Sequence, residues 1–168
     1  RLDYLTSGLL LLTNDGDLCH QLCHPKFHST RGYQVLVDKK LSLTELCLLR
    51  QGVDLEDGRA QCTIEFLSRQ KLSSGAIGYW YQVKVREGRN RLVRRLSSQI
   101  NDTVLALIRY LHGPITLPQD LLPGEYRQLS HQEVQALKKD RPKNSPLKSL
   151  TLSSKRKLSK RPIKNLLP

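Results

Sequence analysis

The segment 1–16 places the carboxylate of Asp3 a few positions ahead of a short apolar run at 9–12. The run is continuous and has turn-forming residues on both sides, a pattern typical of a buried strand. A carboxylate that leads into a buried strand has a rigid support, and catalytic residues are often carried by loops on such supports. A surface acid or a turn-capping Asp is the alternative for Asp3, and the spacing alone favours that alternative.

Strand patterns recur along the chain. Alternating apolar, β-branched and aromatic residues predict further strands at 33–37, 62–67, 79–85, 103–111 and 115–117. The pattern at 79–85 is the clearest, and its alternation puts Tyr79, Tyr81, Val83 and Val85 on one face. Residues 68–78 are rich in Ser and Gly and are expected to form a loop.

Helix patterns are interleaved with these strands. Capping residues and helical spacing predict helices at about 15–24, 42–50, 91–99 and 130–138. The order of strands and helices has no regular βα repeat, so the chain is predicted to be an α+β or mixed-sheet domain and not a doubly wound one.

The positive charge of the chain is concentrated near its end. The sequence holds 28 Lys and Arg against 15 Asp and Glu, and 11 of the former but one of the latter lie in 138–168. Repeated Pro, Ser and Lys there predict a disordered, basic, low-complexity tail at 139–168, after a folded domain at 1–138. Such a tail suits a polyanionic partner, with a solubilising extension as the alternative.

Several classes of protein are disfavoured. The four cysteines lack the spacing of a secreted disulfide framework, so reduced thiols in a cytoplasmic protein are expected. No run approaches the length of a membrane span, and no membrane partner is expected. Cys19, His20, Cys23 and His24 resemble half of a zinc site, but no second pair exists at a suitable spacing, so no metal is expected.

A second informative segment is 86–95, which holds five arginines across a predicted strand-to-helix junction. Guanidinium groups match phosphate oxygens in pairs, and a helix N-terminus adds backbone donors. Arginine at a turn, instead of lysine along a helix face, favours binding of an RNA backbone. The alternative is a solvated, arginine-rich face.

These segments together resemble the ribosomal small-subunit/large-subunit pseudouridine synthase family. The resemblance rests on ordered matches that run from Arg1 to about Leu137. They are the Arg-Leu-Asp motif at 1–3 with the run 6–16, the tyrosine strand at 33–35, the segment 52–58, the arginine motif at 87–95, and the closing segments at 107–117 and 122–129.

The resemblance implies a pseudouridine synthase catalytic fold, with a mixed, mostly antiparallel sheet flanked by helices. It also implies an enzyme that isomerises a uridine of ribosomal RNA to pseudouridine, without a metal or an organic cofactor. Asp3 matches the catalytic aspartate, which acts on the ribose, on the uracil ring or on a ribose proton. Tyr33 matches the residue that stacks on the flipped base, and Arg94 the arginine that pairs with the aspartate. Leu107 matches an apolar wall against the base.

The remaining arginines of the motifs are assigned to the substrate. Arg89, Arg91 and Arg95 are expected to hold the RNA backbone while the uridine is flipped, and Arg1 is grouped with them. Two positions depart from the family pattern: Leu92 stands where a polar residue is usual, and Arg31 replaces the usual Lys before the tyrosine.

The expected partner is ribosomal RNA or a pre-ribosomal particle, bound by a monomer. Large-subunit RNA is slightly favoured over small-subunit RNA by the segment 52–58, the arginine motif and the tail. The family pattern also places a strand and a small RNA-binding domain ahead of Arg1, so an N-terminal part is expected to be missing. The rival interpretation is a non-catalytic RNA-binding or ribosome-assembly protein with the same fold.

Overall fold

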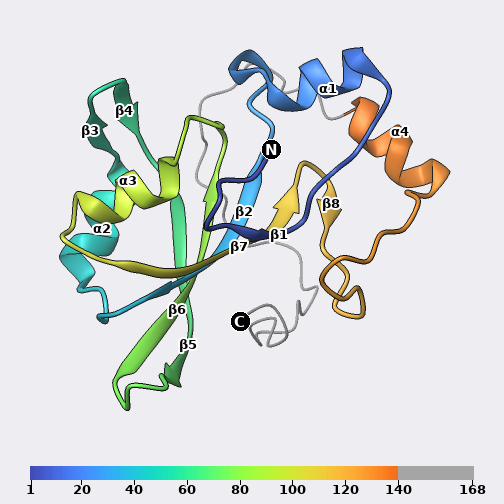
Figure 1. The fold of residues 1–168 in the computed structure, drawn as a ribbon. Coiled ribbons are helices and arrows are strands. Elements are labelled where there is room, and N and C mark those ends of the chain that lie inside the picture. The colour runs from blue at the N-terminus through green and yellow to red at the C-terminus, as the bar shows by residue number, and fades with distance from the viewer. Residues whose placement is uncertain (140–168) are drawn as a thin grey trace.

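The computed structural model describes residues 1–139 and is built around one twisted sheet (Figure 1). The strands run in the order β1-β7-β2-β6-β5, with β8 paired to β7. All of these pairs are antiparallel except β1 with β7, which is parallel. Their bounds are β1 Ser7–Gly8, β2 Arg31–Val37, β5 Thr63–Lys71, β6 Ile77–Val85, β7 Val104–His112 and β8 Ile115–Thr116. The α+β class and the mostly antiparallel sheet are therefore confirmed.

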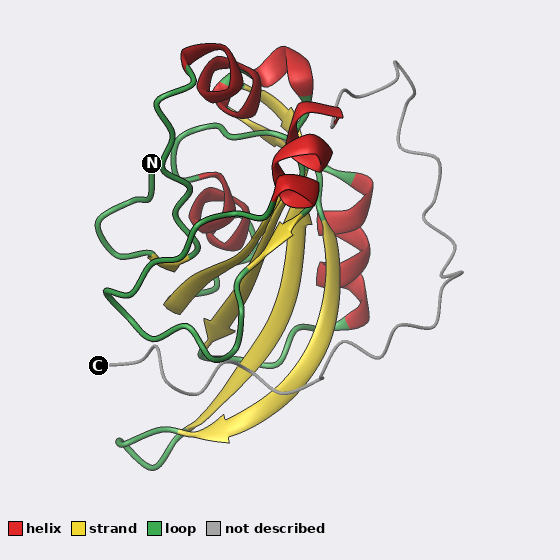
Figure 2. Cartoon of the chain, turned by 90° about the vertical axis from the view of Figure 1, so that its right-hand side faces the viewer, coloured by secondary structure: helices red, strands yellow, loops and turns green. Residues whose placement is uncertain are grey.

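Helices α2 (Leu43–Gln51) and α3 (Leu92–Ser98) close the main core of the domain. Figure 2 shows the helices packed against the long, curved strands. Leu49 of α2 and Leu96 of α3 are buried against Val35 of β2 and Leu107 of β7. The alternation predicted for β6 is confirmed, because Tyr79, Tyr81, Val83 and Val85 all join this core. Burial of such side chains supplies most of the stability of the fold.

A smaller core lies under helices α1 (Gly16–Cys23) and α4 (His131–Lys139), with the short 3-10 turn η1 (Pro25–Phe27) after α1. The two helices lie together, away from α2 and α3 (Figure 1). Leu9, Leu18, Leu22, Ile115 and Leu137 are buried there. Since these leucines come from both ends of the described chain, this core ties the N-terminal segment to α4.

Three of the predicted helix starts are confirmed by their caps. The Asp15 carboxylate accepts a hydrogen bond from the Leu18 amide at 3.0 Å. Ser42 and Glu45 form a complete capping box at the start of α2. Ser130 and Glu133 exchange the equivalent bonds at 2.8 and 3.2 Å ahead of α4. Each cap satisfies backbone donors that the first turn leaves free.

The strand predicted at 9–12 is wrong. Only Ser7 and Gly8 pair with β7, and Leu12 is 82% exposed. The reason is competition for one edge of β7: Gly8 is paired with Arg109, and two residues further along β7 the same edge is already occupied by β8. The chain therefore leaves the sheet after Gly8, and the apolar run serves the smaller core through Leu9 and Leu11 instead.

The loop predicted at 68–78 is also wrong, because β5 continues to Lys71 and β6 begins at Ile77. The turn is closed by the Leu72 amide, which donates to the Ala76 carbonyl at 2.8 Å. Trp80 of β6 explains the longer strand, since its ring is buried on the second face of the sheet and its Nε1 donates to Gln70 at 2.8 Å. Ser and Gly near a turn gave no sign of this cross-strand packing.

A hairpin of β3 (Val53–Leu55) and β4 (Gly58–Ala60) was not predicted from the sequence. It projects from the α2–α3 end of the molecule (Figure 1). Of the tail predicted at 139–168, Lys139 ends α4 and the rest lies outside the described residues. None of the helices within 1–139 has the length and apolar character needed to cross a membrane.

Two carboxyl groups meet where β7 begins. Asp102 is only 8% exposed, and burial together with the facing Asp38 carboxylate raises its pKa from 3.8 to about 7. The Thr103 amide donates to Asp102 Oδ1 at 3.0 Å, whereas Oδ2 has no partner unless it carries a proton. A protonated Oδ2 donates to Asp38, and the pKa of Asp38 is lowered by that bond.

This pair predicts a pH-dependent stability. Between the unfolded pKa of 3.8 and the folded pKa of about 7, the folded chain holds a proton that the unfolded chain releases. Stability is therefore lost as the pH rises through this window, by up to about 1.4 kcal/mol per pH unit. Asp102→Asn is neutral at every pH and keeps the bond from Thr103. Urea unfolding is expected to show the variant more stable than the wild type at pH 8, by a margin that narrows at pH 5 and nearly vanishes below the unfolded pKa of 3.8. An identical pH dependence in both chains contradicts this assignment.

Candidate active site

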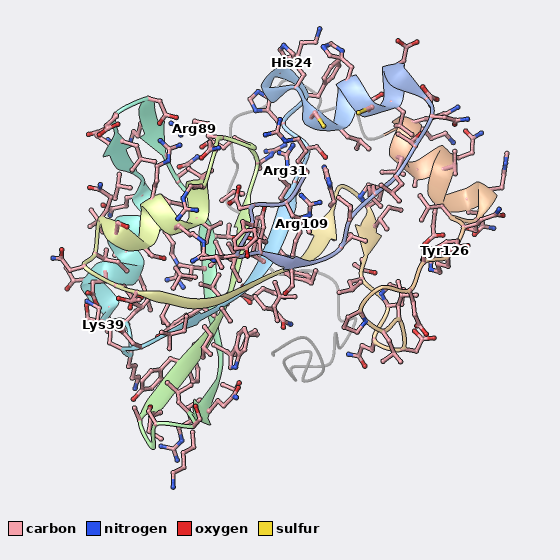
Figure 3. All side chains as sticks on the ribbon, viewed as in Figure 1. His24, Arg31, Lys39, Arg89, Arg109 and Tyr126 are labelled. Atoms are coloured by element: carbon pink, nitrogen blue, oxygen red, sulfur yellow. The ribbon has the colours of Figure 1, made fainter. Side chains whose placement is uncertain are left out.

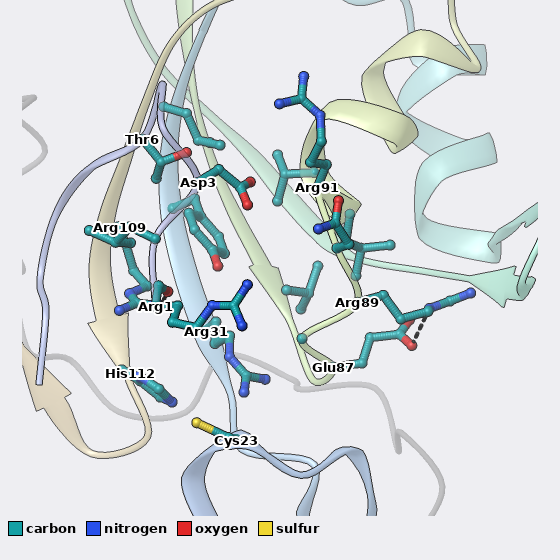
Figure 4. A pocket seen from close by; sticks show the side chains of 18 residues that line it. Arg1, Asp3, Thr6, Cys23, Arg31, Glu87, Arg89, Arg91, Arg109 and His112 are labelled. Atoms are coloured by element: carbon teal, nitrogen blue, oxygen red, sulfur yellow. Dashed lines mark hydrogen bonds and ion pairs between the residues drawn. The ribbon is translucent and has the colours of Figure 1, made fainter. Parts of the chain in front are cut away.

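A cavity of about 350 Å³ opens between the N-terminal segment, β2, β7 and the loop that joins β6 to α3. Figure 4 shows Thr6 and Asp3 at the upper left, Arg109, Arg1 and Arg31 below them, and Arg91 and Arg89 on the opposite side. Of the residues expected from sequence to act on substrate, the cavity brings together Arg1, Asp3, Tyr33, Arg89, Arg91 and Leu107. Arg94 and Arg95 do not line it.

Asp3 lies on a tight turn that is held from outside. The Thr6 amide donates to the Asp3 carbonyl at 2.9 Å and closes the turn. Arg94 of α3 donates through Nη2 to the Leu5 carbonyl at 2.6 Å and through Nη1 to the Val104 carbonyl at 3.3 Å. Arg94 therefore fastens the turn to the start of β7, which fixes where Asp3 can point.

The expected ion pair between Arg94 and Asp3 is not formed: within residues 1–139, no ion pair involves Asp3. Because both Nη atoms of Arg94 are directed at carbonyls, its influence on Asp3 is a longer-range attraction. Burial and the neighbouring Arg91 lower the pKa of Arg94, and Asp3 opposes that shift. Arg94 is thus a positioning residue in this geometry.

A second arginine holds the same segment from β7. Arg109 donates through Nε to the Leu9 carbonyl at 2.8 Å and through Nη1 to the Arg1 carbonyl at 3.2 Å. In return, the Leu9 amide donates to the Arg109 carbonyl at 2.7 Å. Gly8 makes this approach possible, since its φ is +103° and a Cβ there would lie 2.3 Å from the Arg109 carbonyl oxygen.

Tyr33 and Leu107 form the apolar wall beside Asp3. They lie on the adjacent strands β2 and β7, where Leu107 pairs with Val35, two residues from Tyr33. Leu107 is buried and Tyr33 half-buried against the main core, and both line the cavity. Leu92, the residue that departs from the family pattern, is buried in the same core and closes the cavity from α3.

Arg89 and Arg95 are engaged with acids, contrary to the expectation that they hold RNA. Arg95 donates to both oxygens of Asp57 at 2.8 and 2.9 Å. Arg89 donates to Asp57 at 2.8 Å and to both oxygens of Glu87 at 2.8 Å. The paired Arg95, followed by Arg89, lowers the pKa of Asp57. These two arginines dock the β3–β4 hairpin on α3 and leave few donors for a ligand.

Arg91 is the member of the motif that faces the cavity with no acid partner. It is exposed and has a φ of +48°, a left-handed backbone that non-glycine residues adopt at some energetic cost. Arg1 is also exposed at the cavity. Neither guanidinium has an ion pair within the described part of the chain.

Sequence reasoning missed Arg31, Arg109 and His112 as site residues, although all three line the cavity. The strand pattern could have indicated Arg31 and Arg109, because side chains two residues apart lie on the same face of a strand. Arg31 precedes Tyr33 by two residues and Arg109 follows Leu107 by two, so the predicted site residues already marked the face. His112 carries no comparable signal in the sequence, and the structure buries it at the end of β7.

The Cys and His residues of α1 make no metal centre in the described residues, where no group of three possible ligands converges. The rings of His20 and His24 instead lie 5.9 and 6.3 Å from the ring of Phe27.

Comparison with known proteins identifies the family and the fold of the chain. The family described as RNA pseudouridylate synthase matches residues 1–99. A solved structure, titled as the crystal structure of pseudouridylate synthase, superposes with a TM-score of 0.73 at 29% identity and covers 82% of this chain and 57% of its own. The chain belongs to the RNA pseudouridylate synthase family.

Two curated relatives are named ribosomal large subunit pseudouridine synthase B. The one from Pseudomonas aeruginosa is 38% identical over 141 residues, which is 83% of this chain and 36% of the relative. The one from Salmonella typhi is 40% identical over 139 residues, 82% of this chain and 46% of the relative. The chain thus spans less than half the length of these two relatives.

The double pairing of Asp57 predicts the stability of the hairpin. Asp57→Asn removes the charge that joins Arg89 to Arg95 and is expected to lower the free energy of unfolding only modestly, because the carboxylate is partly exposed. Hydrogen exchange at 53–60 is expected to become faster. Asp54→Asn in the same hairpin is the matched control, because its ion pair with Arg59 is exposed and 3.9 Å long. Equal exchange rates in the two variants contradict the docking role of Asp57.

Proposed function

We propose that the chain carries the catalytic site of a pseudouridine synthase that isomerises a uridine of large-subunit ribosomal RNA. The observation that carries this proposal is that Asp3, Tyr33 and Leu107 line one cavity with several arginines, in a chain of this family. Arginine-rich walls suit an RNA backbone, and a half-buried aromatic beside a carboxylate suits a uracil ring that has left its stack.

The reaction requires one bond to break and another to form. The bond from the ribose C1′ to uracil N1 breaks, the ring turns, and C1′ joins C5, which loses its proton while N1 gains one. Asp3 is the group placed to act on the reacting uridine, as nucleophile at the ribose or the ring or as base for a ribose proton. Its turn is closed by Thr6 and fastened by Arg94, so the backbone that carries the carboxylate is held in place before substrate arrives.

The walls of the cavity have distinct roles in this proposal. Tyr33 stacks on the flipped uracil, and Leu107 and Leu92 exclude water from the apolar side. Arg91 and Arg1 face the opening and attract the RNA backbone. Extruding a base costs a few kcal/mol, which contacts of this kind can offset.

The names of the relatives support the choice of large-subunit ribosomal RNA as the substrate. The matched segments cover 83% and 82% of this chain, more than the 99 residues that the family match covers. The basic residues at 139–168, predicted from sequence to add salt-sensitive affinity, are consistent with an RNA partner. A non-catalytic assembly factor would need the same arginines but would not need a carboxylate in the cavity.

The proposal predicts that Asp3 is required for turnover and not for binding. Asp3→Asn is expected to lower the isomerisation rate by at least about a thousandfold, because the amide is a poor nucleophile and base. Release of tritium from C5-labelled uridine in rRNA transcripts measures turnover, and filter binding measures affinity. Affinity is expected to stay within a few-fold of the wild type, since the backbone of the turn is unchanged.

Asp17→Asn is the control for this experiment, because Asp17 is an exposed acid on α1, away from the cavity. It is expected to behave as the wild type. Equal turnover in wild type and Asp3→Asn rules out the proposed role of the carboxylate. RNA binding by the wild type with no turnover on any rRNA transcript favours the assembly-factor alternative.

A further inference from the structure

Two arginines at the cavity are buried without a counter-charge. Arg31 is 7% exposed and Arg109 3%, and neither forms an ion pair in the described part of the chain. Arg31 donates to the carbonyls of Leu22 at 2.8 Å and Ser29 at 3.2 Å. Carbonyl oxygens satisfy N–H groups, but they do not neutralise a cation, so two positive charges stay buried side by side.

Other arginines of the same molecule show that this is unusual. Arg89 and Arg95 are only partly buried, yet they share Asp57 and Glu87 between them. Burial lowers the pKa of Arg31, and the neighbouring Arg109 lowers it further. The most buried cations of the cavity are thus the ones that the protein itself does not pair.

His112 completes the group. Its ring is 7% exposed, Nε2 lies 3.4 Å from the Leu22 carbonyl, and Nδ1 is buried with no partner. Because a carbonyl only accepts, Nε2 carries the proton of the neutral ring and Nδ1 is left as a bare acceptor. Burial, Arg31 and Arg109 lower the pKa of His112 to about 4. An anion beside these three groups would let Nδ1 take a proton and donate to it.

The acids that line the cavity do not neutralise these cations. Glu87 has both oxygens on Arg89, and neither Glu87 nor Asp3 is among the charged groups that shift the pKa of Arg31 or His112. Gly88 leaves room for the Arg31 guanidinium, since a Cβ there would lie 2.7 Å from its Cζ. Nε of Arg31 and Nη2 of Arg109 have no hydrogen-bond acceptor within residues 1–139 and remain available to a ligand.

We propose that Arg31, Arg109 and His112 form a phosphate-binding site that takes a phosphodiester group of the RNA. Guanidinium groups pair with phosphate oxygens through parallel hydrogen bonds. The positive charge of two arginines is more than enough to neutralise one phosphodiester. Asp3 and Tyr33 line the same cavity, so a nucleotide seated against them brings its own backbone toward the site (Figure 4). The choice of RNA as the source of the phosphate rests on the function proposed above.

Figure 3 shows that Arg31 and Arg109 lie near the centre of the molecule, whereas Lys39 and Tyr126 lie at its edges. This placement separates the site from exposed basic residues that bind anions weakly anywhere on a surface. It also supplies a matched control for variants: Arg127, which is paired with Glu133 at 2.7 Å outside the cavity.

The site is tested by titrating the chain with inorganic phosphate and with chloride at equal ionic strength, followed by NMR of histidine and arginine side chains. Phosphate is expected to move the resonances of His112, Arg31 and Arg109 and to raise Tm, while chloride does neither. Arg31→Gln is expected to weaken phosphate binding by about tenfold to a hundredfold, as for the loss of a charged hydrogen bond. His112→Gln, which keeps a donor for Leu22, is expected to weaken it less, and Arg127→Gln not at all.

The source of the phosphate is tested with uridylyl-uridine, which carries only a phosphodiester, and uridine monophosphate. Uridylyl-uridine is expected to move the same resonances as phosphate. Shifts with the monoester alone, or the same response to phosphate and chloride, overturn the proposal. Phosphate binding in a chain without isomerase activity leaves this site standing and removes the proposed function. Isomerase activity with no phosphate response leaves the proposed function standing and rules out this site.

Discussion

The geometry of the cavity depends on how the N-terminal segment is held against β7. A two-residue parallel pairing is too short to fix a strand, so the segment needs further attachment. Arg109 supplies it from within β7 by donating to the carbonyls of Leu9 and Arg1, and Arg94 supplies it from α3 by donating to Leu5. The carboxylate of Asp3 lies between these attachments. Side chains on two different elements therefore set the position of a turn whose own backbone pairing is slight.

The arginines divide into groups with different electrostatics. Arg89 and Arg95 are neutralised by Asp57 and Glu87 and stabilise the hairpin. Arg94 and Arg109 bind carbonyls and hold the turn, so they keep their charge inside or beside the cavity. Arg91 and Arg1 face the opening. A motif that forms one basic cluster in the sequence thus contains structural, positioning and ligand-facing arginines. The arginines with an acid partner are the structural ones.

The sequence predicted most of the elements because their signals are local. Ser42 with Glu45 and Ser130 with Glu133 mark helix starts through bonds between near neighbours, and the alternation at 79–85 marks a strand that packs on one face. The failures have non-local causes. The run at 9–12 looked like a strand, but β8 occupies the edge of β7 that it would need.

The candidate site was predicted as a set of residue types, and the cavity does bring Asp3, Tyr33 and Leu107 together. The partners of the arginines at and near the site were not predicted correctly. Asp57 lies 38 positions from Arg95 along the chain, and nothing local indicates that it would take that arginine and Arg89 away from a ligand. The resemblance also gave Arg94 a carboxylate partner, whereas the turn offers it a backbone carbonyl. Long-range partners of charged groups are decided by packing, and a motif does not encode them.

The proposed activity of this cavity is the isomerisation of a uridine in large-subunit ribosomal RNA. The most direct measurement is a map of pseudouridine at single-nucleotide resolution in large-subunit rRNA from cells that lack the gene. The account predicts the loss of pseudouridine at a specific position and its return when the wild-type gene, but not a gene with an inactive cavity, is restored. An unchanged map of large-subunit rRNA would contradict the account.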